Sequence, residues 1–157
     1  LDHALQALFG LSAVQGVAGR WWAGETLRPL TLVVQGGVAV IGRQRRSEVG
    51  RPLQAAHHAA AAALIGAMAS PRTFRVPEGL PLPAMGEEAP EDRPALLAAL
   101  KQCRDGMRSW SAGDWGATAF RHPAAGWMGG EDVLAFLTFH ILHHRRILQR
   151  QGAAKND

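Results

Sequence analysis

The chain has 157 residues, 47% of them apolar, and arginine carries almost all of the positive charge behind its formal net charge of +4. Tyr is absent, other aromatic residues are few, and no stretch alternates convincingly between apolar and polar residues, which predicts an all-α fold and excludes a protein built mainly of strands. No apolar run is long enough to cross a bilayer, and no Gly-rich phosphate loop or helix-turn-helix pattern accompanies the charge, which argues against membrane and nucleic-acid partners.

Two helices are expected in the N-terminal part of the chain. The first covers residues 2–17, where apolar side chains form a stripe along one face. The second begins near Pro29, a favourable first-turn residue, and ends at Gly42. Gly36 and Gly37 lower its helix propensity, so we expect another part of the chain to approach the backbone closely there.

A third helix is expected from Pro52 to Met68, in a segment rich in alanine. After it, residues 71–94 are rich in Pro, Gly and Glu and are too broken for regular structure. Neither side of this segment is large enough to be stable alone. We therefore interpret it as a long crossover within one domain that covers residues 1–157.

The fourth helix is expected from Arg93 or Pro94 to about Trp110. Apolar residues at spacings of three and four form a single stripe along it: Leu96, Leu100, Cys103, Met107 and Trp110. Because Cys103 is the one cysteine of the chain, an internal disulfide is excluded, which is typical of a reducing cytoplasm. Its place in the stripe favours a buried apolar role over that of a nucleophile.

The last helix is expected from Glu131 to about Gln151, after a second long loop at residues 113–130. Acidic residues at its start are favourable next to the positive end of the helix dipole. One face of this helix is shared by Val133, Phe136, Leu137, His140, His144 and Ile147. Four main helices with one long crossover predict a four-helix bundle.

His140 and His144 lie four residues apart, so their side chains project side by side from the face predicted to line the core. Two neutral imidazoles on adjacent turns can bind one divalent metal, although a third protein ligand must come from elsewhere. Alternatively, His140 hydrogen-bonds inside the core while His143 and His144 approach the solvated end. His57 and His58 could complete a metal site, but an Ala-rich helix favours their interpretation as a surface pair.

The closing segment RHPAAGWMGGEDVLAFLTFHILHHRRILQ resembles that of the DinB/YfiT-like superfamily, and most closely a branch with an HP-x-x-G loop before a final HxxHHRxQ helix. The matching residues here are His122, Pro123 and Gly126, then His140, His143, His144, Arg145 or Arg146, and Gln149. The resemblance implies a four-helix bundle with a long crossover, in which three histidines bind a divalent metal, typically Zn, Ni or Fe. Two of these histidines match His140 and His144, whereas the third position falls on Gln35. Because an amide oxygen is a poor substitute for imidazole on such metals, the site is weakened, moved or lost.

Members of this superfamily include transferases and isomerases that use a low-molecular-weight thiol. The resemblance therefore implies a divalent-metal-dependent thiol S-transferase, in which the metal ligands are His140, His144 and Gln35. On the same basis, Arg145 or Arg146 would attract an acidic thiol cofactor, and the metal would hold the thiol as thiolate. The alternative is a non-catalytic bundle with a degenerate metal site, which binds a small molecule or dimerises, and Gln35 favours it. A homodimer is compatible with both interpretations.

Overall fold

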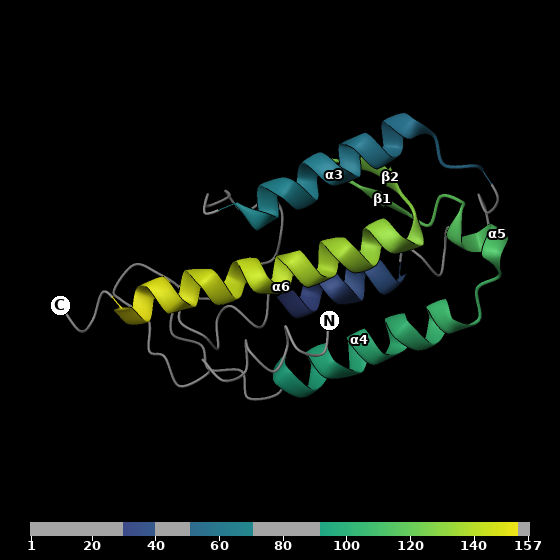
Figure 1. Cartoon of the computed structure of the whole chain (residues 1–157). Helices are drawn as coiled ribbons and strands as arrows, with labels where there is room; N and C mark the ends of the chain where they lie inside the picture. The colour runs from purple at the N-terminus through teal and green to yellow at the C-terminus, as the bar shows by residue number, and fades with distance from the viewer. Residues whose placement is uncertain (1–29, 40–50, 71–91, 154–157) are drawn as a thin grey trace.

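The computed structural model describes residues 30–39, 51–70 and 92–153, and most of these residues are helical (Figure 1). The elements are a helix at residues 30–39, α3 (Ala55–Ala69), α4 (Asp92–Arg108), α5 (Ala112–Trp115), β1 (Phe120–His122), β2 (Gly126–Met128) and α6 (Gly130–Ala153). The mainly helical character expected from the sequence is therefore confirmed, with a small two-stranded sheet in addition. The predicted helix at residues 2–17 and most of the predicted crossover lie outside the described residues.

The long helices run lengthwise beside one another, with α6 between α3 and α4 in Figure 1. Contacts at both ends fix the direction of α3 relative to α6. His58 near the start of α3 pairs with Asp132 near the start of α6, and Met68 near the end of α3 accepts a hydrogen bond from Arg146. The two helices are therefore parallel, and the chain must return along the molecule between them.

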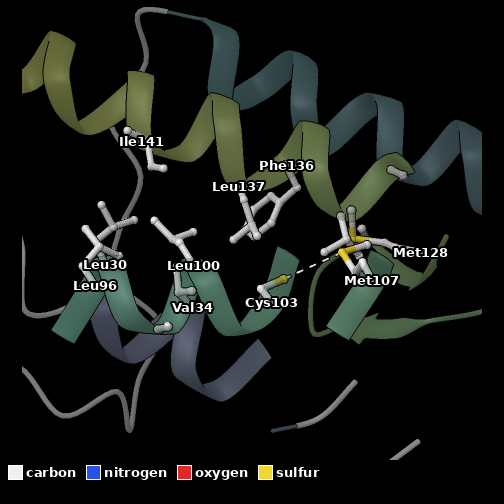
Figure 2. Packing of buried hydrophobic residues seen from close by; sticks show 14 of the residues in the cluster. Leu30, Val34, Leu96, Leu100, Cys103, Met107, Met128, Phe136, Leu137 and Ile141 are labelled. Atoms are coloured by element: carbon white, nitrogen blue, oxygen red, sulfur yellow. Dashed lines mark hydrogen bonds between the residues drawn. The ribbon is translucent and has the colours of Figure 1, made fainter. Parts of the chain in front are cut away.

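The apolar stripe predicted for the fourth helix forms one side of the core. Leu96, Leu100, Cys103 and Met107 of α4 are all buried, as the spacing indicated. Figure 2 shows these side chains packed with Leu30 and Val34 from residues 30–39 and facing Phe136, Leu137 and Ile141 of α6. Full burial of each large side chain contributes about 1.5–3 kcal/mol, so this cluster is the main source of stability for the helix packing.

Close backbone approach is found at the start of α6. No atom of the described residues lies within 4 Å of a Cβ built on Gly36 or Gly37, so the close neighbour expected there is not among them. A Cβ on Gly130, at the start of α6, would instead lie 2.6 Å from ring atoms of both Trp110 and Trp115. The edge-to-face pair of these tryptophans, with centroids 5.2 Å apart, packs directly on the glycine backbone.

The predicted loop at residues 113–130 contains regular structure. Part of it forms α5, whose first turn is closed by reciprocal hydrogen bonds between Ser111 and Asp114. The rest forms an antiparallel hairpin in which Phe120 pairs with Met128 and His122 with Gly126, and Gly126 has a positive φ of 70°. Strands of three residues are too short for an alternating pattern, which explains why the sequence did not reveal them. The hairpin brings His122 next to α6.

Candidate metal centre

His140 and His144 lie on successive turns of α6, and their Nε2 atoms are 3.1 Å apart. The two rings are tilted by 32° with their centroids 4.9 Å apart, and both side chains are half-buried. Two histidine nitrogens bound to one zinc ion at about 2.0–2.1 Å each would be separated by roughly 3.3 Å in a tetrahedral arrangement. The observed spacing therefore fits two ligands of the same ion.

Burial keeps both imidazoles uncharged at neutral pH. Loss of solvent, with smaller contributions from the nearby His143 and His122, lowers the pKa of His140 from 6.5 to about 4. The pKa of His144 is also lowered, first by burial and then by His140 and His143. A neutral imidazole has the lone pair that a metal ligand needs, so the pair is in the protonation state required for metal binding.

Among the described residues, the Nδ1 atom of His140 lacks the hydrogen bond that usually fixes the ring of a metal-bound histidine. His140 Nδ1 is buried and has no hydrogen-bond partner in the part of the chain that the structure describes. A buried polar atom without a partner costs about 1–3 kcal/mol. Metal-bound histidines commonly donate this second N–H to a carbonyl or carboxylate, which fixes the ring. The two Nε2 atoms therefore have the spacing of metal ligands, but within the described chain the His140 ring lacks the second hydrogen bond that commonly fixes such a ligand.

The structure does not bring Gln35 into the buried face of its helix. Gln35 is exposed on the helix at residues 30–39, whereas the preceding Val34 is buried in the core. Across residues 30–39, 51–70 and 92–153, no group of three or more His, Cys, Asp or Glu side chains is arranged to hold a metal ion. The described residues thus supply His140 and His144, and any further ligand has to come from another part of the chain or from a bound molecule.

Ring contacts extend on both sides of the His140–His144 pair. His122 of β1 meets the edge of Phe136 with centroids 4.9 Å apart, and Phe136 meets His140 at 5.3 Å. At the other end, the rings of His144 and His143 are 5.8 Å apart. In the sequence, the HP-x-x-G loop was the one signal that pointed to His122. The hairpin, which the sequence did not predict, is what brings this ring to α6.

The match to a family model covers residues 1–151 and carries the description "Protein of unknown function (DUF1569)". The chain belongs to this DUF1569 family. No curated protein and no solved structure matches it. Within the described residues of this DUF1569 chain, none of the helices combines the length and apolar character needed to traverse a lipid bilayer.

Two other histidines of the DUF1569 chain take part in local structure. His57 Nδ1 accepts the backbone N–H of Gln54 at 3.1 Å and closes the first turn of α3. His58 Nδ1 lies 3.2 Å from Asp132 Oδ2, and its side chain is largely exposed. These contacts agree with the interpretation of a surface pair, and neither residue lies in a metal-ligand cluster of the described chain.

His143 and Arg146 hold the end of α3 in this DUF1569 protein. One interpretation of the sequence placed His143 toward the solvated end, but its side chain is only 6% exposed. A hydrogen bond to the Met68 backbone partly offsets the lowering of its pKa by burial. Arg146 Nε donates to Leu142 O at 3.2 Å, and its two other nitrogens donate to the carbonyl oxygens of Ala69 and Met68. Two of the three guanidinium nitrogens of Arg146 therefore bond to the backbone at the C-terminus of α3, and the third bonds within α6.

Arg145, unlike Arg146, has a guanidinium nitrogen without a hydrogen bond to the described residues. Its side chain is half-buried, and its Nε is buried without a hydrogen-bond partner among the described residues. An unpaired guanidinium N–H in a poorly solvated position favours an anionic partner. Of the two arginines predicted to attract an acidic cofactor, Arg145 is the one with an unused buried donor.

Proposed function

We propose that His140 and His144 are the protein half of a divalent-metal centre inside a four-helix bundle of the DinB/YfiT type. The observation that supports this most directly is the 3.1 Å separation of two neutral Nε2 atoms on the core face of α6. Imidazole suits Zn, Ni and Fe, and helix bundles commonly hold metals between inward-facing side chains. The helix at residues 30–39 with α3, α4 and α6 supports the bundle arrangement.

The proposed activity is thiol S-transfer with a low-molecular-weight thiol, in the cytoplasm. A divalent ion at the pair would supply the charge that keeps a thiol in its nucleophilic thiolate form at neutral pH. His140 and His144 would hold and orient the ion, and the Phe136 ring packs against that of His140. Arg145, with its unpaired Nε, is the side chain that would attract an acidic thiol.

A second candidate function is a non-catalytic bundle that binds a small molecule or dimerises. The exposure of Gln35 and the unpartnered Nδ1 of His140 favour it. In that case, the contact between His140 and His144 is a hydrogen bond within a polar patch of the core, in which one Nε2 donates and the other accepts. The two functions differ in one measurable property, since only the first requires a stoichiometric metal.

Titration calorimetry with Zn²⁺ and Ni²⁺ on untagged protein distinguishes the metal centre from the non-catalytic bundle. We expect one binding site in the wild type, lost in His140→Gln and in His144→Gln. His58→Gln is the matched control, because it removes an exposed histidine far along the sequence from the pair. Absence of binding in the wild type would support the non-catalytic bundle, and unchanged binding in both core variants would place the metal elsewhere.

Binding of a thiol to the proposed metal centre is tested on the Co²⁺-loaded protein. Addition of 2-mercaptoethanol should produce a thiolate-to-cobalt charge-transfer absorption, because the proposed centre has ligand positions that the protein does not fill. Arg145→Met should weaken the response to an acidic thiol such as mercaptosuccinate more than the response to 2-mercaptoethanol. No absorption change with either thiol, on protein that holds cobalt, would exclude thiol chemistry at this centre.

A further inference from the structure

His122 brings a third imidazole to the same face of α6 from a different element. Its ring packs edge-on against Phe136 with centroids 4.9 Å apart, and more loosely against Phe120 at 6.1 Å. Phe136 lies one turn before His140 and touches it at 5.3 Å. Residues four apart on a helix share a face, so His122 stands over the face that carries the histidine pair.

A hydrogen bond fixes which nitrogen of His122 carries the proton. Nδ1 accepts the backbone N–H of Ala124 at 3.1 Å, within the turn of the hairpin. Burial lowers the pKa of His122, so the ring is neutral near pH 7. A neutral ring that accepts at Nδ1 has its proton on Nε2. Because that nitrogen is protonated, it cannot bind a metal and is available as a hydrogen-bond donor.

We propose that the Nε2–H of His122 donates a hydrogen bond to a small anionic ligand held at the His140–His144 pair. This inference rests on the proposed metal centre and assigns the class of ligand to it. A divalent ion with only uncharged imidazole ligands keeps its full positive charge, which favours an anion in the remaining positions. A hydrogen bond to an ionised acceptor is also about twice as strong as one between neutral groups, so a fixed donor at this place selects thiolates and other anions over neutral ligands.

Two substitutions separate the two nitrogens of His122. His122→Asn keeps an acceptor near the position of Nδ1, where the Ala124 N–H bonds, and removes the donor at Nε2. His122→Gln does the reverse, because its longer side chain can present an N–H near the position of Nε2. A residue that only shapes the turn would tolerate Asn and not Gln, whereas a ligand donor tolerates Gln and not Asn.

The experiment is a titration of the Co²⁺-loaded wild type and both variants with azide and with 2-mercaptoethanol, followed by visible absorption. We expect all three proteins to bind equal amounts of cobalt. Loss of one hydrogen bond to a charged ligand should weaken azide and thiolate binding about tenfold or more in His122→Asn. His122→Gln should stay within about threefold of the wild type, by the same conversion.

Three results would overturn the proposal. Azide and thiol affinities of His122→Asn equal to those of the wild type, on cobalt-loaded protein, would refute the donor role and leave the metal centre standing. Loss of cobalt from His122→Asn, with helical content unchanged by circular dichroism, would show that His122 is needed to hold the metal itself. A wild type that takes up no cobalt would refute the proposed function and this inference with it.

Discussion

Arg146 of α6 donates to the carbonyl oxygen of Met68 in the last turn of α3, seventy-eight positions earlier in the chain. The same guanidinium also donates to Ala69 O and to Leu142 O. It therefore joins the C-terminal end of α3 to α6. The carbonyl groups at a helix end have no partners within the helix, so a side chain that satisfies them from another element fixes the packing of both.

Replacing this arginine should destabilise the fold. We expect Arg146→Met to lower the free energy of unfolding by about 1–3 kcal/mol, because the carbonyl oxygens lose charged donors. Arg121→Met, on the exposed side of β1, is the matched control and should have little effect. Urea denaturation followed by circular dichroism measures both. Equal midpoints for the two variants would show that Arg146 does not hold α3.

Stability should depend on pH through the buried histidines. The pKa of folded His140, about 4, lies below the ordinary value of 6.5, so the unfolded chain binds more protons between these values. The free energy of unfolding of the metal-free protein should therefore be at its full value above pH 6.5 and fall as the pH drops toward 4. His140 alone would contribute roughly 3 kcal/mol to this change. The lowered pKa values of His144, His143 and His122 act in the same direction.

Urea titrations at pH 4, 5, 6 and 7 test this dependence. His140→Gln should reduce the slope of the curve between pH 4 and 6.5, because it removes one of the buried neutral imidazoles that become protonated on unfolding. The same slope in the wild type and in this variant would contradict the assignment of His140 as a buried neutral base.

Two glycines should respond in opposite ways to alanine. A Cβ at Gly130 would lie 2.6 Å from rings of Trp110 and Trp115, so Gly130→Ala should destabilise by about 1–3 kcal/mol through overpacking. Gly106 lies within α4, where nothing among the described residues comes within 4 Å of an added Cβ. Gly106→Ala should instead stabilise by about 0.5–1 kcal/mol through helix propensity. Thermal unfolding of the two variants tests these predictions. Shifts of the same sign in their melting temperatures would contradict this packing.

Cys103 should be unreactive in the folded protein. Its side chain is 5% exposed, its Sγ lies 3.8 Å from Met107 Sδ, and burial raises the pKa of the thiol (Figure 2). A thiol-exchange reagent should therefore modify it only as fast as the protein unfolds, and urea should accelerate the reaction. In a Cys103→Ala background, Gln102→Cys places a thiol at an exposed neighbour and should react at once. Rapid modification of native Cys103 would be inconsistent with its place in the core.

The sequence predicted what depends on local pattern. The stripe of α4 and the first half of the apolar face of α6 follow from spacings of three and four, which report directly on which side of a helix is buried. In the second half of α6, Ile141 and Leu148 are buried, whereas the predicted Ile147 is only half-buried. The burial of Cys103 followed from the same spacing. His140 and His144 were found in this way too, because side chains four apart on a helix must lie side by side whatever the helix packs against.

The remaining features depend on contacts between distant segments. The pattern gave no sign that His143 would be buried or that Arg146 would bond to α3, since both depend on how α3 packs beside α6. The three-residue strands that position His122 are shorter than any periodic signal. Gln35 was chosen by resemblance, and its exposure depends on how its helix is rotated in the fold. Such features require the three-dimensional arrangement.

The most direct test of the proposed metal centre is the metal content of untagged protein, by elemental analysis after equilibration with Zn, Ni, Mn and Fe and removal of unbound metal. We expect close to one metal ion per chain in the wild type and in His58→Gln, and close to none in His140→Ala. No metal in the wild type under any of these conditions, or metal retained by His140→Ala, would contradict a centre built on His140 and His144.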